Sequence, residues 1–160
     1  KERLGEQKGV DYRVCDFTKI EEALDSNDSY DVIFTSFALH HLDDSEKTEL
    51  LHKMYAVLKP GGWFINADII IGPSILMEER NQQLRVEGIV ERARLVDDVD
   101  ERFLDKKTTR EMLDALEEGE HDQPITMQED IRCMHEAGFK DVAILWKEYR
   151  EVVFAGYKRK

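Results

Sequence analysis

Two histidines stand side by side just after an apolar stretch of the chain. Residues 30–42 read YDVIFTSFALHHL, so His40 and His41 follow a run of apolar residues. An imidazole ring accepts a proton near neutral pH, which makes each histidine a candidate general base. Because neighbouring side chains point in different directions, we expect at most one of the two to face a site. The alternative is that both line or support a loop.

The residues before the histidines have the composition of a buried strand. Residues 31–35 read DVIFT and are nearly all apolar, as in a strand covered on both faces. In an α/β fold, ligands bind beyond the carboxyl ends of such strands. We therefore expect the chemistry of this chain at residues 36–41.

A helix and a second apolar strand follow this segment. Asp43 or Asp44 is placed to cap a helix, which a Pro-Gly-Gly turn at residues 60–62 is expected to end. The next strand is predicted over residues 63–71 and contains Asp68. A buried carboxylate needs partners. Asp68 either faces a substrate from the strand end or bonds to neighbouring backbone or an arginine.

The whole chain alternates strands with helices, which predicts an α/β fold with a doubly wound, mostly parallel sheet. A final antiparallel hairpin is predicted at its edge. Residues 72–125 are too long for a simple connection and form a helical insertion, with one helix opened by Ser74 and a second capped by Thr108. The remaining elements are a strand at 10–15, a helical turn at 20–24, a helix with a capping box at 126–129, and strands at 141–146 and 151–157.

Charged and aromatic side chains outside these strand ends have ordinary explanations. The charges of the first insertion helix, among them Glu78, Arg85 and Arg92, predict a solvated face with pairs four residues apart. A substrate lid is the functional alternative for the whole insertion. Trp63 and Trp146 are predicted to pack in the core or at an edge rather than to stack on a ligand.

In order and spacing, these segments resemble a class I S-adenosylmethionine-dependent methyltransferase. YDVIFTSFALHHL resembles the fourth strand of that family with its loop, and LKPGGWFINAD resembles the entry to the fifth. VDYRVCDFT resembles the third strand, and EAGFKDVAIL with EVVFAGYKR resembles the closing helix and last two strands. The resemblance covers residues 10–71 and 127–158. It implies a Rossmann-like methyltransferase fold, S-adenosylmethionine as cofactor, S-adenosylhomocysteine as product, and methyl transfer to a small-molecule acceptor.

The resemblance also assigns roles to particular residues. It implies that Asp16 accepts the adenine amino group, with Phe17 beside it, and that Ser36 and Phe37 meet the methionine end of the cofactor. The alternatives are a turn or cap at Asp16 and simple packing at Phe37. A base is needed only where an O–H or N–H must lose its proton, and His41, followed by His40, is the candidate.

Two parts of the family pattern are absent from these 160 residues, namely the glycine-rich cofactor loop and the acidic residue that ends the second strand. We therefore expect residues 1–160 to be a single, N-terminally incomplete domain of a longer protein, with the first two strands missing and an incomplete cofactor site. The alternative is a non-catalytic binding or scaffold module that keeps the fold. A nicotinamide-dependent oxidoreductase would need a glycine-rich fingerprint of its own.

The composition of the chain limits the classes of binding partner that we expect. The formal net charge of −12 argues against a nucleic-acid partner, which requires a basic surface. The longest apolar runs are too short to cross a bilayer, so no membrane partner is expected. The two cysteines lie far apart without a Cys/His cluster, which predicts free thiols in a reducing cytoplasm and no metal site. An incomplete sheet favours association, for example as a homodimer.

Overall fold

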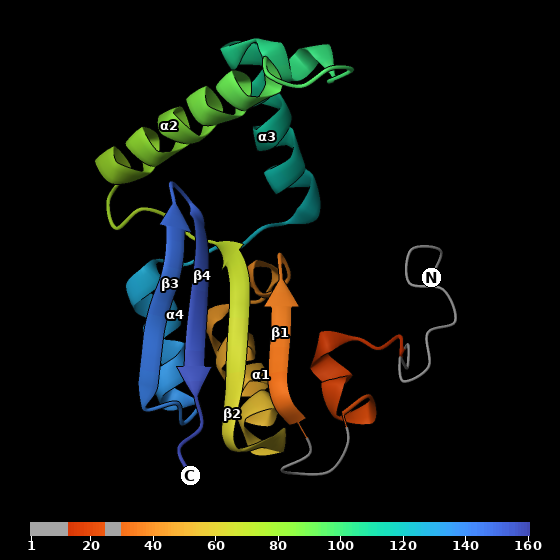
Figure 1. The fold of residues 1–160 in the computed structure, drawn as a ribbon, viewed down its shortest axis with the longest axis vertical. Helices are drawn as coiled ribbons and strands as arrows, with labels where there is room; N and C mark the ends of the chain where they lie inside the picture. The colour runs from red at the N-terminus through yellow and green to blue at the C-terminus, as the bar shows by residue number, and fades with distance from the viewer. Residues whose placement is uncertain (1–12, 25–29) are drawn as a thin grey trace.

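The computed structural model describes residues 13–24 and 30–160 (Figure 1). The helices are α1 (Asp44–Val57), α2 (Ile75–Ala93), α3 (Lys106–Glu120) and α4 (Met127–Glu136), with short 3-10 helices η1 (Phe17–Glu22), η2 (Leu39–His41) and η3 (Glu101–Leu104). The strands are β1 (Tyr30–Ser36), β2 (Leu58–Ile69), β3 (Asp141–Glu148) and β4 (Glu151–Tyr157).

The four strands form one mixed sheet in the order β1-β2-β4-β3. β1 and β2 are parallel, and β4 is antiparallel to both of its neighbours. The predicted terminal hairpin is therefore confirmed, with β3 at an edge. The register sets Ser36 opposite Ala67, so the carboxyl ends of β1 and β2 finish together. This shared end is where the α/β rule places a ligand.

The structure corrects two element boundaries. Residues 13–16 belong to no strand, and the rest of the strand predicted at 10–15, residues 10–12, lies outside the described residues. The Pro-Gly-Gly segment was expected to form a turn, but it lies inside β2, which begins at Leu58. Leu58 pairs with Tyr30, and the Lys59 ammonium contacts the Asp31 carboxylate at 2.8 Å, so pairing with β1 starts as soon as α1 ends.

Helices α1 and α4 pack against the same face of the sheet, behind it in Figure 1. The Asp43 side chain and Glu46 form a capping box at α1, and Thr126 and Glu129 form the predicted box at α4. Apolar side chains of α1 are buried, and they meet the sheet and α4 in one core that contains Leu50, Leu51, Met54, Phe64, Met134, Phe139 and Phe154.

The opposite face of the sheet carries large apolar side chains that the described residues leave open. Phe34 is 62% exposed, Trp63 is 43% exposed and Trp146 is 49% exposed. Neither tryptophan is therefore in the core: Trp146 lies on the edge strand β3, and the Trp63 ring contacts the Tyr157 ring with centroids 5.0 Å apart. Helices on both faces, as in a doubly wound sheet, are not seen among the described residues.

The insertion forms a helical layer beyond the strand ends, at the top of Figure 1. The Ser74 side chain caps α2 as expected, whereas Asp105 rather than Thr108 caps α3 because its carboxylate accepts the Lys107 and Thr108 N–H groups. No helix in the described part of the chain is long and apolar enough to cross a membrane.

Partly buried ion pairs hold this layer on the sheet. The Arg150 side chain is almost fully buried, donates from Nε to the Ile70 carbonyl at 3.0 Å and contacts Glu117 at 2.5 Å. Arg85 bridges Glu117 and Glu151 at 2.9 and 2.7 Å. The solvated face predicted for α2 is therefore wrong at Arg85, which faces α3 and the hairpin instead.

Candidate active site

The carboxyl end of β1 turns sharply into η2. Ser36 is exposed, and Phe37 follows with a left-handed φ of 46° while its N–H donates to the Ala67 carbonyl at 2.8 Å. A left-handed conformation costs free energy in a phenylalanine, and such strain gathers at ligand sites. The turn directs the chain over the end of β2, so His40 and His41 lie above its last residues.

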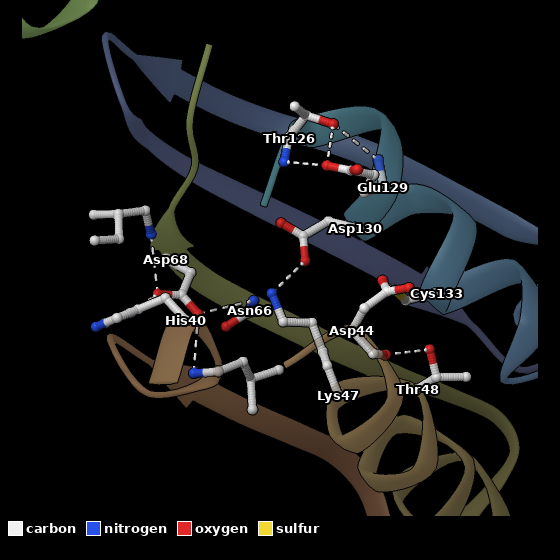
Figure 2. Close-up of polar contacts among 12 residues, drawn as sticks. His40, Asp44, Lys47, Thr48, Asn66, Asp68, Thr126, Glu129, Asp130 and Cys133 are labelled. Atoms are coloured by element: carbon white, nitrogen blue, oxygen red, sulfur yellow. Dashed lines mark hydrogen bonds and ion pairs between the residues drawn. The ribbon is translucent and has the colours of Figure 1, made fainter. Parts of the chain in front are cut away.

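Asp68 organises this strand end from inside β2. Its carboxylate accepts the Leu39 N–H at 3.0 Å and the Ile69 N–H at 3.0 Å. It also contacts His40 Nδ1 at 2.5 Å, as Figure 2 shows. Of the two alternatives left open for Asp68, the structure shows bonding to backbone, together with a histidine in place of an arginine.

The contact with Asp68 fixes how His40 presents its ring. A carboxylate accepts only, so Nδ1 carries a proton, and in the neutral ring Nε2 keeps a free lone pair. Burial of the ring, which is 3% exposed as a residue, opposes the charged form. The carboxylates of Asp68 and Asp122 outweigh that effect, and the pKa of His40 is raised.

The loop after α3 completes the site from the far end of the insertion. His121 ends α3 in the left-handed conformation, and the Asp122 N–H donates to the Glu117 carbonyl at 3.1 Å. The Gln123 N–H then donates to the His40 carbonyl at 2.7 Å. These bonds seat the loop on η2 and bring the Asp122 carboxylate within 3.3 Å of His40 Nε2 and 3.2 Å of His41 Nδ1.

A cavity of about 160 Å³ opens between this strand end and α3. Besides His40, its lining combines four apolar side chains (Phe37, Ile69, Leu113 and Leu116), three carboxylates (Glu117, Glu120 and Asp122) and Arg85. A larger hollow of about 470 Å³ lies between α2 and α3, but most of its lining side chains are charged. Of these two, the smaller cavity is the better candidate because it adjoins an oriented, buried imidazole.

The residues named from the sequence fall into two groups. Ser36, Phe37, His40 and His41 come together at the end of β1. Asp16 and Phe17 lie instead at the start of η1, which follows residues 13–16 and packs next to α1 through Ile20. Their assignment to the adenine stays a prediction, as do the roles of the other four.

Sequence reasoning missed Glu120 and Asp122. Neither lies in a strand or at a strand end, and Asp122 is 82 positions from His40, so no local spacing joins them. The only signal was a polar His-Asp pair just after a helix.

Comparison with known proteins identifies the fold. Residues 1–64 match a sequence family described as a methyltransferase domain. Over 86 residues the chain is 31% identical to an uncharacterized methyltransferase of Geobacillus kaustophilus, a match that covers 54% of this chain and 37% of that protein. The chain therefore spans little more than a third of the length of its curated relative.

Solved structures share the fold at low identity. A possible exported protein from Bordetella parapertussis superposes with a TM-score of 0.59 at 18% identity, covering 91% of this chain and 43% of that one. Human N-acetylserotonin methyltransferase, solved in complex with SAM, superposes with a TM-score of 0.57 at 17% identity. The match covers 100% of this chain and 37% of that one. The chain therefore has a methyltransferase-like α/β fold, and the two sequence matches support the resemblance to class I methyltransferases noted in its sequence.

Proposed function

We propose that this chain forms the acceptor side of an S-adenosylmethionine-dependent methyltransferase that acts on a small molecule. The observation that carries the proposal is the buried His40–Asp68 pair, which faces a cavity at the end of β1 in a methyltransferase fold. Methyl transfer from a sulfonium needs an aligned nucleophile above all, and a base where that nucleophile must lose a proton. The cavity supplies the first requirement and His40 the second.

His40 suits the role of base better than His41, which was the first choice from the sequence. His40 is buried, oriented by Asp68, and lines the cavity. The His41 side chain is 35% exposed, and its Nδ1 has no hydrogen bond to fix a tautomer. A base acts well when a partner holds its ring in one orientation, which favours the histidine with the carboxylate.

The cofactor is proposed to meet Ser36 and Phe37 at the same strand end. The support is the fold, together with human N-acetylserotonin methyltransferase, a structural neighbour that binds SAM. The resemblance adds two strands and a glycine-rich loop on the free side of β1, which is an edge strand among the described residues. In that arrangement, the insertion (72–125) lies over the acceptor as a lid.

A methyl-transfer assay tests this proposal on the full-length protein. Methyl-labelled S-adenosylmethionine is supplied with a panel of small phenols and amines, and labelled product is counted. We expect turnover in the wild type, a loss of about 10²–10⁴-fold in His40→Ala, and a smaller loss in His41→Ala. His52→Ala, on the exposed side of α1, is the matched control and should match the wild type. Full activity in His40→Ala would contradict the assignment.

A further inference from the structure

We propose that His40, His41, Asp122 and Glu120 form a binding site for one divalent transition-metal ion, with Zn²⁺ as the best fit. Each residue offers one nitrogen or oxygen atom, and the four atoms lie within 4.8 Å of one another. Two imidazoles with two carboxylates are a donor set that Zn²⁺ and its neighbours accept. This site goes beyond the proposed methyl transfer, because it needs neither cofactor nor acceptor.

The distances within the cluster suit a shared ion. Bonds of about 2.1 Å in tetrahedral geometry place neighbouring ligand atoms about 3.4 Å apart. Asp122 Oδ1 lies 3.3 Å from His40 Nε2 and 3.2 Å from His41 Nδ1. Direct hydrogen bonds do not explain these contacts, because Asp122 Oδ1 and His41 Nδ1 are buried atoms without a hydrogen-bond partner.

Burial makes this arrangement costly without a cation. The Asp122 side chain is 7% exposed, and its Oδ1, which has no hydrogen-bond donor and meets a positive charge only when an imidazole is protonated, carries a desolvation penalty while the two rings are neutral. An ion bound between Oδ1 and the two ring nitrogens would satisfy all three atoms at once. Such an unsatisfied group, aimed at two imidazoles, separates this cluster from an ordinary group of surface acids.

The surrounding structure holds the metal-ligating side chains in position before an ion binds. His40 donates its Nδ1 proton to Asp68, which is the carboxylate–histidine arrangement found behind metal-ligating histidines. The Gln123 N–H and side-chain amide donate to the carbonyls of His40 and His41 at 2.7 and 3.2 Å. The two sides of the site are therefore fixed to each other by backbone contacts. An ion and a proton compete here, because both use the lone pair of His40 Nε2.

Titration of the full-length, EDTA-treated protein with Co²⁺ and Zn²⁺ tests the site. We expect one ion per chain, with the strong visible absorption of Co²⁺ in a tetrahedral site, lost on addition of Zn²⁺. Asp122→Asn and His41→Ala should each weaken binding at least tenfold, while His52→Ala should leave it unchanged. Circular dichroism of each variant checks that the fold is intact.

Two results would overturn the inference. One is no binding of either ion at millimolar concentration, and the other is binding that Asp122→Asn and His41→Ala leave unchanged. Titration of the same metal-free samples with S-adenosylhomocysteine is independent of the ion. A protein that binds S-adenosylhomocysteine but no metal therefore rejects this site alone, and one that binds metal but not S-adenosylhomocysteine rejects only the methyltransferase proposal.

Discussion

At the scale of single residues, Asp68 is the group on which the candidate site depends. Its carboxylate holds both the Leu39 N–H at the start of η2 and the ring of His40. The position and the tautomer of the candidate base are thus set by one side chain inside β2. A carboxylate inside an apolar strand was visible in the sequence, but its partner was not, because His40 lies in a separate loop.

Asp68→Asn should lower kcat for methyl transfer by about 10²-fold while changing KM and the affinity for S-adenosylhomocysteine much less. The amide has nearly the shape of the carboxylate, so the loop is kept, but its charge no longer stabilises the ring of His40. Steady-state kinetics and a binding titration on the full-length protein separate the two effects. Equal losses in binding and turnover would show that Asp68 only supports the fold. Asp141→Asn, in an exposed pair with Arg159, is the control.

At the scale of elements, a buried ion pair joins α1 to α4. Lys47 Nζ contacts Asp130 Oδ1 (Figure 2) at a distance of 3.0 Å, and both side chains are almost fully buried. Burial outweighs the attraction of Lys47 and raises the pKa of Asp130 from 3.8 to about 6. Between pH 4 and pH 6 the folded protein therefore binds more protons than the unfolded chain, and its stability falls as the pH rises through that window.

The double variant Lys47→Met/Asp130→Leu should remove this fall in the free energy of unfolding between pH 4 and pH 6, which is on the order of 3 kcal/mol. At pH 7 it should be as stable as the wild type or more stable, because apolar residues can replace a buried pair. Asp130→Leu alone leaves a buried, unpaired ammonium and should cost about 3–5 kcal/mol. Urea unfolding at several pH values measures the stability of the wild type, the double variant and Asp130→Leu. If stability falls with rising pH equally steeply in the double variant and the wild type, the assignment of this pH dependence to Asp130 is refuted.

Arg150 holds the insertion to the sheet, so loss of this side chain should loosen the helices of the insertion. Arg150→Gln should destabilise the protein by about 3 kcal/mol and speed amide exchange in α2 and α3, since Glu78 and Glu117 lose their buried partner. Arg92→Gln breaks an exposed pair with Glu148 and should cost less than about 1 kcal/mol. Unchanged exchange in both helices after Arg150→Gln would mean that other contacts hold the layer.

At the scale of the whole molecule, the sequence predicted most elements but not how they meet. Strand periodicity located β1, β3 and β4, and the Thr126–Glu129 capping box located the start of α4, because those signals are local. Periodicity could not show that the face with Trp63 and Trp146 lacks a covering helix among the described residues, since alternation marks two faces without saying what covers each. For the same reason Asp122 was missed: its position over His40 is set by the path of the insertion.

The family match and the fold lead to the same central claim, that the end of β1 belongs to a site for S-adenosylmethionine and its acceptor. Calorimetric titration of the full-length protein with S-adenosylhomocysteine tests it most directly. We expect saturable binding of one molecule per chain, weakened by Asp16→Ala. No heat of binding at millimolar S-adenosylhomocysteine would contradict the claim and leave a non-catalytic module with a methyltransferase fold.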